Sequence, residues 1–284
     1  MIKTVNQFFG GTIGGESNPF ITVWNTENTS SGSSGSSQIS LPLRFFAGGY
    51  NLKVDWGDGN VTRVYNYNDS AASHTYSSPG VYTVTIFGNV HDFRFANGGD
   101  RLKILNVSQW GKCTFLSTSA FYGCENLDVT ALDVPDLSLS NQVLVDMFRG
   151  CVSLVGNSSF NDWDVSNQIS ALRCFFVAET FNAPINNWNT SNFTNFTNML
   201  NRCYDFNQDL SLWSFENATS CLGFMNNTDS FTSANYDLLL NSLASQSLNS
   251  GVTISMGNVK YGAGAASSRA DIISNYSWTI NDGG

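Results

Sequence analysis

The chain has 284 residues, which is long enough for two domains that each bury a core. Only 12% of the residues are charged, against about 25% in a typical soluble domain, and the net charge is −9. Because there is no run of Lys and Arg to offset phosphate charge, we expect neither nucleic acid nor an anionic membrane as a partner. No apolar run approaches the roughly 18 residues of a membrane-spanning helix.

Residues 1–19 are predicted to form an N-terminal arm with two Gly-Gly pairs that ends at Pro19. The arm has one lysine but no continuous apolar stretch, so it lacks the pattern of a secretory signal peptide and we expect it to be retained. Two interpretations stay open: a flexible tail, and a strand that docks on a partner.

The region from residue 20 to 95 has the alternation of β-strands, beginning with residues 20–24. A Ser-Gly run at residues 30–37 has the composition of a flexible loop or linker, and a long hairpin loop between two strands accounts for it equally well. Residues 38–43 resume the alternation, with an edge marked by Pro42. Further on, Gly57-Asp58-Gly59 predicts a tight turn between two strands. A second hairpin is predicted over residues 74–86, turned at Pro79-Gly80.

Asp55, Asp58 and His74 are the titratable groups of this region that could be considered for a metal site or acid–base chemistry. Two carboxylates are too few for calcium, which takes six or more oxygen ligands. Aspartates beside a turn are favoured for their local hydrogen bonds, so we expect no metal.

The two predicted hairpins carry a W-G-D-G turn followed by an H-x-Y…P-G-x-Y-x-V pattern, and there the segment resembles the PKD family of immunoglobulin-like β-sandwiches. The resemblance implies a spacer or adhesive module without catalysis. The residues that carry this turn motif are Trp56, Gly57, Asp58, Gly59, Tyr76, Gly80 and Tyr82.

A 25-residue repeat dominates the second half of the chain. Such a period predicts a solenoid, because each unit is too small to bury its own apolar face and must stack on the next. Three kinds of residue recur at this step and are expected in the repeat core: Trp163, Trp188 and Trp213; Asn167, Asn192 and Asn217; Phe181, Phe206 and Phe231. We expect each Asn to end a short strand as a buried amide that bonds the turns above and below. Stacked Trp and Asn side chains could alternatively form a sugar-binding platform.

The cysteines fall at repeat positions and form no C-x-x-C pair. Cys124, Cys151 and Cys203 share one slot, where Ala178 stands in the turn between. A slot shared by Cys and Ala indicates a small apolar filler, so we expect free core thiols, with neither disulfides nor a metal cluster.

The turn from Trp188 to Asn207 follows the pattern W-[DN]-[TV]-S-N-x-[TS]-x-[MF]-x-x-M-F-x-x-[AC]-x-x-F-N almost throughout, with departures in other turns at Glu216 and at one inserted residue after Asn167. Here the chain resembles the BspA-like leucine-rich repeat surface proteins. The resemblance implies a parallel β-stack on one side and short helical turns on the other.

After residue 232 the repeat breaks, and helices are predicted at residues 234–246 and 265–274 with strands at 252–256 and 277–280. The predicted fold class is therefore mainly β: an N-terminal immunoglobulin-like sandwich (20–95), a leucine-rich-repeat-type solenoid (96–232) and an α/β terminal cap (233–284).

We expect neither an enzyme nor a cofactor. The chain has no phosphate loop, no H-E-x-x-H and no G-x-S-x-G motif, and its two histidines lie in the sandwich region. Asp162 and Asp164 flank Trp163, as ordinary residues of a coil edge do, although paired carboxylates are also the machinery of glycoside hydrolases.

The resemblances and the unprocessed N-terminus predict a non-enzymatic structural or adhesion protein on the exterior of a tailed-phage virion, as a capsid decoration, head-fibre or tail-fibre component. It would bind other virion proteins through the arm or sandwich and present the solenoid to a host-surface glycan or protein; a homo-oligomer is compatible with this role. The first alternative is a BspA-like adhesin on a bacterial cell surface, and the second is a polysaccharide-degrading spike. The ligand and the position on the particle stay open.

Overall fold

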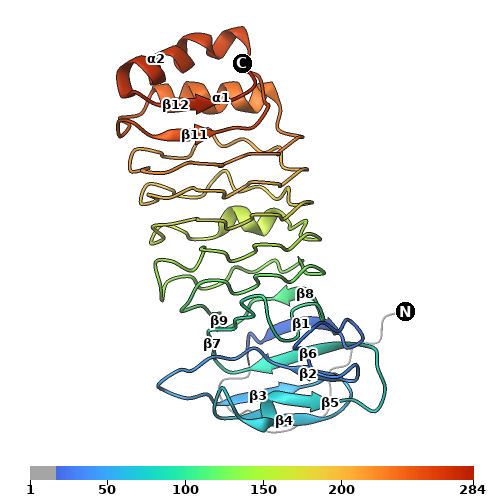
Figure 1. Ribbon diagram of the computed structural model, residues 1–284. Coiled ribbons are helices and arrows are strands. Elements are labelled where there is room, and N and C mark those ends of the chain that lie inside the picture. The colour runs from blue at the N-terminus through green and yellow to red at the C-terminus, as the bar shows by residue number, and fades with distance from the viewer. Residues whose placement is uncertain (1–16) are drawn as a thin grey trace, which may run out of the picture.

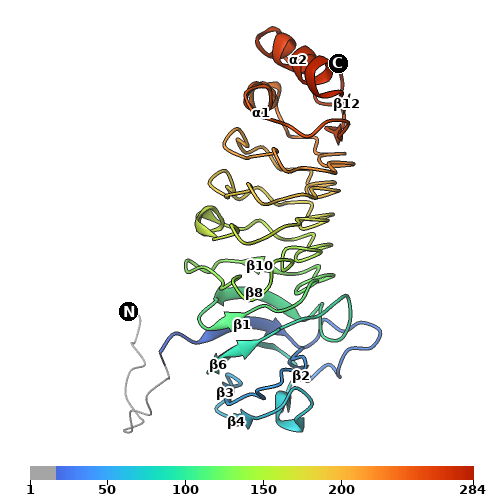
Figure 2. The same ribbon diagram turned by 90° about the vertical axis from the view of Figure 1, so that its left-hand side faces the viewer.

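The computed structural model describes residues 17–284, so the predicted N-terminal arm lies almost wholly outside the described residues. The described part of the chain is mainly β, as predicted, with 19% of its residues in strands and 13% in helices. It is elongated: a β-sheet region occupies one end, turns of chain stack above it, and two helices close the other end (Figure 1). The same order is seen from the side (Figure 2).

The largest sheet has six strands in the order β10-β8-β1-β6-β3-β4, and three two-stranded pairs, β2–β5, β7–β9 and β11–β12, complete the β-structure of residues 17–284. The strands are β1 Phe20–Asn25, β2 Gln38–Ser40, β3 Leu52–Asp55, β4 Val61–Val64, β5 Ser73–Thr75, β6 Val81–Phe87, β7 Val90–His91, β8 Ile104–Gln109, β9 Cys113–Thr114, β10 Asp128–Val129, β11 Thr253–Ser255 and β12 Thr279–Asn281. Short 3-10 helices lie at η1 Ser70–Ala72, η2 Ser158–Asp162 and η3 Ala263–Ala265.

The first predicted hairpin is confirmed. Strands β3 and β4 pair antiparallel, with Leu52 opposite Val64 and Asp55 opposite Val61. Gly57 has a φ of +81°, and a Cβ there would lie 2.4 Å from the carbonyl oxygen of Thr83, so the turn requires glycine.

The second predicted hairpin is wrong. β5 pairs with β2 instead of β6, and β6 lies between β1 and β3 in the large sheet. The alternation of a strand shows which residues face the core, but it is the same for every antiparallel partner. The Pro79-Gly80 segment therefore connects two strands that lie in different sheets.

The sheet region is continuous with the turns above it. β8 pairs antiparallel with β1 and parallel with β10, so strands from the region predicted as repeats complete the sheet of residues 20–95. One hydrophobic cluster runs from Phe20 to Ile280. The self-contained immunoglobulin-like sandwich that we expected is not what the strand order forms, and the division into domains stays a prediction.

The stacked turns are held by backbone hydrogen bonds between turns. The N–H groups of Phe148, Phe175 and Leu200 donate to carbonyl oxygens of the next turn at 2.8, 2.9 and 2.9 Å. Two residues per turn have a left-handed conformation, which interrupts the extended backbone of a strand. The second of these two positions is occupied by Gly123, Gly150, Val177, Arg202 and Asn227.

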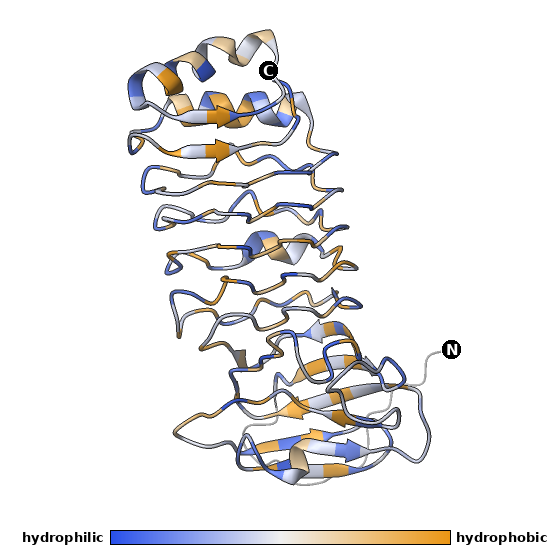
Figure 3. Cartoon of the chain, in the orientation of Figure 1, coloured by the Kyte–Doolittle hydropathy of each residue, from blue (hydrophilic) through white to orange (hydrophobic). Residues whose placement is uncertain are grey.

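The short strands expected in the turns are absent. Between residues 130 and 252, all of which the structure describes, the only β-bonding is by isolated bridges such as those of Asn195 with Ser170 and Ser220. At the predicted strand around Asn167, the Gln168 N–H donates to the carbonyl oxygen of Val165 at 2.9 Å and closes a bend. Figure 3 shows hydrophobic and hydrophilic residues interspersed along each turn, which is the pattern that a ring of chain around an apolar centre requires.

The C-terminal elements agree with prediction. Helices α1 Ser233–Ala244 and α2 Ala266–Tyr276 form, and β11 pairs with β12 in parallel, with Ile254 opposite Ile280. Thr232 caps α1 by accepting a hydrogen bond from the Asn235 N–H. No helix in the described part of the chain is both long and apolar enough to cross a membrane.

Candidate functional site

The repeated tryptophans lie in one column. The ring centroids of Trp163 and Trp188 are 6.2 Å apart, as are those of Trp188 and Trp213, with interplanar angles of 19° and 5°. All three side chains are 3% exposed or less. A ring this buried cannot stack on a sugar, so the tryptophans are not the platform considered above.

The indole N–H groups of the column differ. Trp188 and Trp213 donate to the carbonyl oxygens of Phe160 and Ile185 in the preceding turn, at 2.6 and 2.9 Å. The Trp163 Nε1 is buried without a partner, and its ring contacts that of Trp110 edge-on, with the ring centroids 5.7 Å apart. The repeated phenylalanine rings are also stacked, with ring centroids 5.9 Å apart for Phe181 and Phe206 and 6.5 Å apart for Phe206 and Phe231.

The cysteine slot carries hydrogen bonds as well as apolar packing. The thiols of Cys151 and Cys203 lie 3.2 and 3.1 Å from carbonyl oxygens of the preceding turn. Thr228 occupies the same slot in the last regular turn, and its hydroxyl donates in the same way at 2.9 Å. Burial raises the pKa of both cysteines well above its usual range, which keeps the thiols protonated as donors.

All six cysteines are buried and free, with Cys124 at the start of this column. Sequence reasoning treated the slot as a filler and missed its donor role, although the threonine at the same phase was a signal. No group of three or more metal-ligating side chains occurs in residues 17–284.

The repeated asparagines are at the surface, contrary to the expectation of buried amides. Asn167, Asn192 and Asn217 are exposed. The amides of Asn192 and Asn217 each donate a hydrogen bond of 2.7 Å to a serine carbonyl oxygen of the preceding turn. Among residues 17–284, neither amide forms a hydrogen bond with the following turn. The amide of Asn167 donates to two carbonyl oxygens, each at 3.2 Å. Each of these asparagines lies in a tight turn closed by a backbone hydrogen bond, such as that from the Gln168 N–H to the Val165 carbonyl oxygen, and its side chain lies outside the apolar core.

Two residues after Asn192 and after Asn217, a threonine continues the same polar ladder. The hydroxyl of Thr194 donates to the Ile169 carbonyl oxygen at 3.1 Å, and that of Thr219 to the Thr194 carbonyl oxygen at 2.9 Å. Asn192, Thr194, Asn217 and Thr219 are all exposed, and we call them the Asn–Thr edge.

The turn motif of the sheet region is an aromatic stack. His74 lies against Trp56 at 5.1 Å, and Tyr76 against Tyr82 at 3.7 Å. The Tyr76 hydroxyl donates to the Trp56 carbonyl oxygen at 3.0 Å, and the His74 Nε2 lies 2.8 Å from an Asp58 carboxylate oxygen. Partial burial acts to raise the pKa of Asp58, but hydrogen bonds from His74 and Asn60 outweigh this effect and lower it.

The rest of this motif is also structural. Just after β1, the Gly80 N–H donates to the Thr26 hydroxyl at 2.9 Å, and this hydroxyl donates to the Gly80 carbonyl oxygen at 3.3 Å. Gly59, with a φ of +90°, lies in open space at the turn. The motif therefore fixes the corner of the sheet and brings together no nucleophile with the Asp58–His74 pair.

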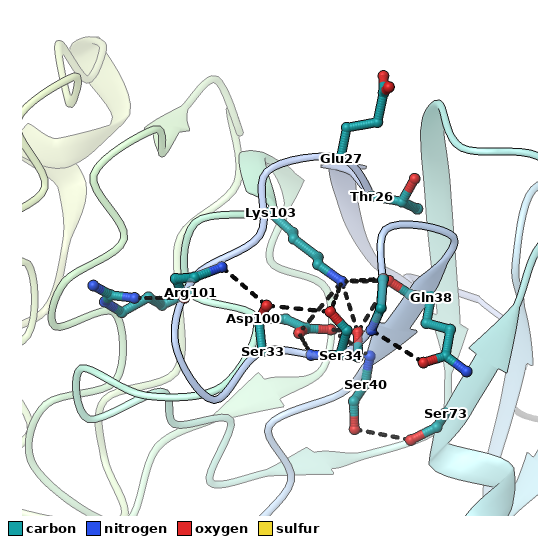
Figure 4. A network of polar contacts seen from close by, with 12 residues as sticks. Thr26, Glu27, Ser33, Ser34, Gln38, Ser40, Ser73, Asp100, Arg101 and Lys103 are labelled. Carbon is teal, nitrogen blue, oxygen red and sulfur yellow. Dashed lines mark hydrogen bonds and ion pairs between the residues drawn. The ribbon is translucent and has the colours of Figure 1, made fainter.

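A buried ion pair orders the Ser-Gly run that resembles a linker. The Lys103 Nζ, fully buried, donates to the carbonyl oxygens of Ser34, Gly35 and Gln38 at 3.0, 2.8 and 2.8 Å (Figure 4). Asp100 accepts from the N–H groups of Ser34 and Ser40 at 2.7 and 2.8 Å, and lies 3.5 Å from the Lys103 Nζ. Burial lowers the pKa of Lys103, and the Asp100 carboxylate opposes this. Residues 30–37 form a loop, as predicted, but these bonds hold it in place, and it does not close a hairpin because β1 and β2 lie in different sheets.

Residues 116–237 match a family model described as "Mycoplasma protein of unknown function, DUF285". The match spans less than half of the chain. No curated protein and no solved structure matches the chain.

This match overturns the sequence resemblances as we stated them. It supports the BspA-like part, because DUF285 is a BspA-like family, but it supports neither a PKD domain nor leucine-rich repeats. The mixed six-stranded sheet and the strand-free turns described above agree with that correction. The W-G-D-G turn motif and the 25-residue repeat motif are local patterns of hydrogen bonding and packing, which unrelated folds can share.

Proposed function

We propose that this chain is a non-enzymatic protein of a bacterial cell surface that binds its target through the Asn–Thr edge, with the stacked turns acting as a solenoid scaffold. The observation that carries the proposal is the match of residues 116–237, which include this edge, to a BspA-like family of surface proteins. Repeated turns are well suited to this role, because they present the same groups at a fixed step over an extended surface.

The geometry of the edge supports binding to a polar target. The amide N–H groups of Asn192 and Asn217 are used within the protein, but their side-chain oxygens accept no hydrogen bond from residues 17–284. Adjacent turns bonded like parallel strands repeat these acceptors about every 4.8 Å. A surface glycan or an extended peptide offers donors at comparable intervals.

The absence of catalysis is supported by the state of the candidate acids and nucleophiles. Hydrogen bonds from the Ser166 hydroxyl and N–H lower the pKa of Asp164, and a glycosidase acid needs a raised one. The cysteine thiols are buried and protonated, so they are poor nucleophiles.

The test is the binding of the labelled chain to a panel of bacterial cells, measured by flow cytometry. We expect saturable binding that Thr194→Glu with Thr219→Glu weakens at least about tenfold, since two new charges on the edge must be desolvated. Asn187→Glu with Leu212→Glu is the matched control, because it adds the same charge at two exposed positions elsewhere on the same turns. Periodate or protease treatment of the cells then tells a glycan target from a protein.

Equal weakening by both double variants, or no saturable binding to any cells, contradicts the proposal. The virion roles expected from the sequence would use the same surface, and no observation favours them over a bacterial cell surface. A polysaccharide-degrading activity would release reducing sugar from capsular material, and we expect none.

A further inference from the structure

We propose that a pocket beside the Ser-Gly loop binds an oxyanion — a carboxylate, phosphate or sulfate group on a small molecule or sugar — between Arg44 and Arg94. The inference goes beyond the proposed function, because the pocket belongs to the sheet region and contains no residue of the Asn–Thr edge.

A backbone bridge and one side-chain hydrogen bond bring Arg44 and Arg94 to the same pocket. Leu43 and Phe93 form an antiparallel bridge, and both are buried. The Arg94 N–H donates to the Pro42 carbonyl oxygen at 2.9 Å, and both Arg44 and Arg94 line the pocket. The Arg44 Nε donates to the Arg94 carbonyl oxygen at 3.1 Å, which fixes one arginine against the other.

The pocket at this face is about 490 Å³ in volume. The Ser-Gly loop forms one wall, residues 40–44 another, and residues 94–100 the third. A Cβ at Gly32 or Gly99 would meet no atom within 4 Å, so the rim is open to a ligand. Because Lys103 and Asp100 hold the loop in place, this wall is already formed before a ligand arrives.

The charge of the two arginines is not compensated within the described chain. Neither Arg44 nor Arg94 forms an ion pair with a carboxylate of residues 17–284. The arginines that do are Arg101, Arg149, Arg173, Arg202 and Arg269. Asp100 also lines the pocket, but its carboxylate is occupied by Ser34, Ser40 and Lys103. In a chain of net charge −9, two unpaired guanidinium groups at one pocket select strongly for an anion.

An unpartnered donor supplies a second, independent observation. The Nε of Arg94 is buried and has no hydrogen-bond partner. An unsatisfied buried donor costs about 1–3 kcal/mol, and more when it is charged, so such groups are rare. A guanidinium binds carboxylate and phosphate oxygens through paired N–H groups, and a small rotation of the Arg94 side chain toward the pocket would give its Nε an oxyanion as acceptor.

Titration calorimetry with sodium sulfate, phosphate and glucuronate, at constant ionic strength set with chloride, tests the proposal. We expect saturable 1:1 binding of at least one of them, weakened at least about tenfold by Arg94→Gln and likewise by Arg44→Gln. Arg63→Gln is the control, because this exposed arginine of β4 carries the same charge outside the pocket. Binding of glucuronate alone assigns a carboxylate on a sugar, and binding of sulfate or phosphate assigns a tetrahedral anion.

The proposal is overturned if no anion binds saturably up to about 20 mM, which is far weaker than a built site would give. It is also overturned if Arg63→Gln weakens binding as much as the pocket variants do. Melting temperatures identify a variant that fails to fold, and because either pocket arginine can be tested alone, one folded variant is enough to decide.

Discussion

The tryptophan column allows one hydrogen bond to be isolated from packing. Trp163→Phe and Trp188→Phe remove the same indole from neighbouring turns of one stack, and both side chains are at most 3% exposed. They differ in that the Trp188 Nε1 donates to the Phe160 carbonyl oxygen at 2.6 Å, whereas the Trp163 Nε1 has no partner.

The difference in stability can be worked from these contacts. Both variants lose packing of about 1–2 kcal/mol, which cancels in the comparison. Trp188→Phe also loses a hydrogen bond of about 1 kcal/mol. The Phe160 carbonyl oxygen still accepts from the backbone N–H of Trp163 at 3.4 Å, so it is not left without a donor. Trp163→Phe instead removes an unsatisfied buried donor. Trp188→Phe should therefore be less stable than Trp163→Phe by at least about 1 kcal/mol.

Melting temperatures followed by circular dichroism measure this difference. For a chain of this size, about 1 kcal/mol corresponds to a melting temperature about 2–4 °C lower for Trp188→Phe. Trp213→Phe should behave like Trp188→Phe, since its Nε1 donates at 2.9 Å to the carbonyl oxygen of Ile185. Equal melting temperatures for all three variants would refute the reasoning that the column is pinned by its indole N–H groups.

Three further outcomes are expected. Val177 is β-branched with a φ of +63°, so Val177→Gly should stabilise the chain by about 1 kcal/mol, and a lower melting temperature would contradict the left-handed slot. Cys203→Ser should destabilise the chain less than Cys174→Ser, by about 1–3 kcal/mol. The Cys203 thiol already donates to a carbonyl oxygen at 3.1 Å, which a serine hydroxyl can replace, whereas a hydroxyl at position 174 would be buried with no acceptor that the thiol already used. Urea unfolding of both variants measures the difference. Burial acts to raise the pKa of Asp282, but the Arg269 ion pair at 2.8 Å outweighs it and lowers the pKa, so the stability gained above about pH 4 is lost as the pH falls through this lower value. Asp282→Asn should flatten that loss in melts from pH 6 to pH 2, and an unchanged pH profile would exclude the pair as its cause.

The sequence predicted those features that depend on periodicity or on residues close in the chain. The β3–β4 hairpin follows from the glycines at its turn, and β11 and β12 fall within or beside the strands predicted at residues 252–256 and 277–280. Helices α1 and α2 follow from the change to helical spacing after residue 232. In each case, the information lies within one element or one period.

The failures concern partners distant in the chain. The partner of β5 is β2, which starts 35 residues earlier, and the alternation of apolar residues in one strand does not indicate that it pairs with the other. The Ser-Gly run has the composition of a linker, but Lys103, some 70 residues away, orders it. The Arg44–Arg94 pocket was missed for the same reason, because a bridge between Leu43 and Phe93 creates it.

The prediction assigned hydrogen bonds between turns to the asparagines alone and treated the tryptophans and cysteines as apolar filling. Each phase also places a hydrogen bond between turns: the indole of Trp188, the thiol of Cys203 and the amide of Asn192 each reach a carbonyl oxygen of the preceding turn. Apolar burial tolerates shifts along the stack, whereas a donor must meet its acceptor to within a few tenths of an ångström. A one-residue insertion in a turn would therefore leave the core apolar but misplace these donors, unless a polar side chain fills the gap. Gln168, buried at the insertion after Asn167, does so by accepting from the Val143 N–H at 2.9 Å and donating to the Ser140 carbonyl oxygen at 2.7 Å. The constant step of the regular turns is thus set by their polar contacts, and the apolar column follows it.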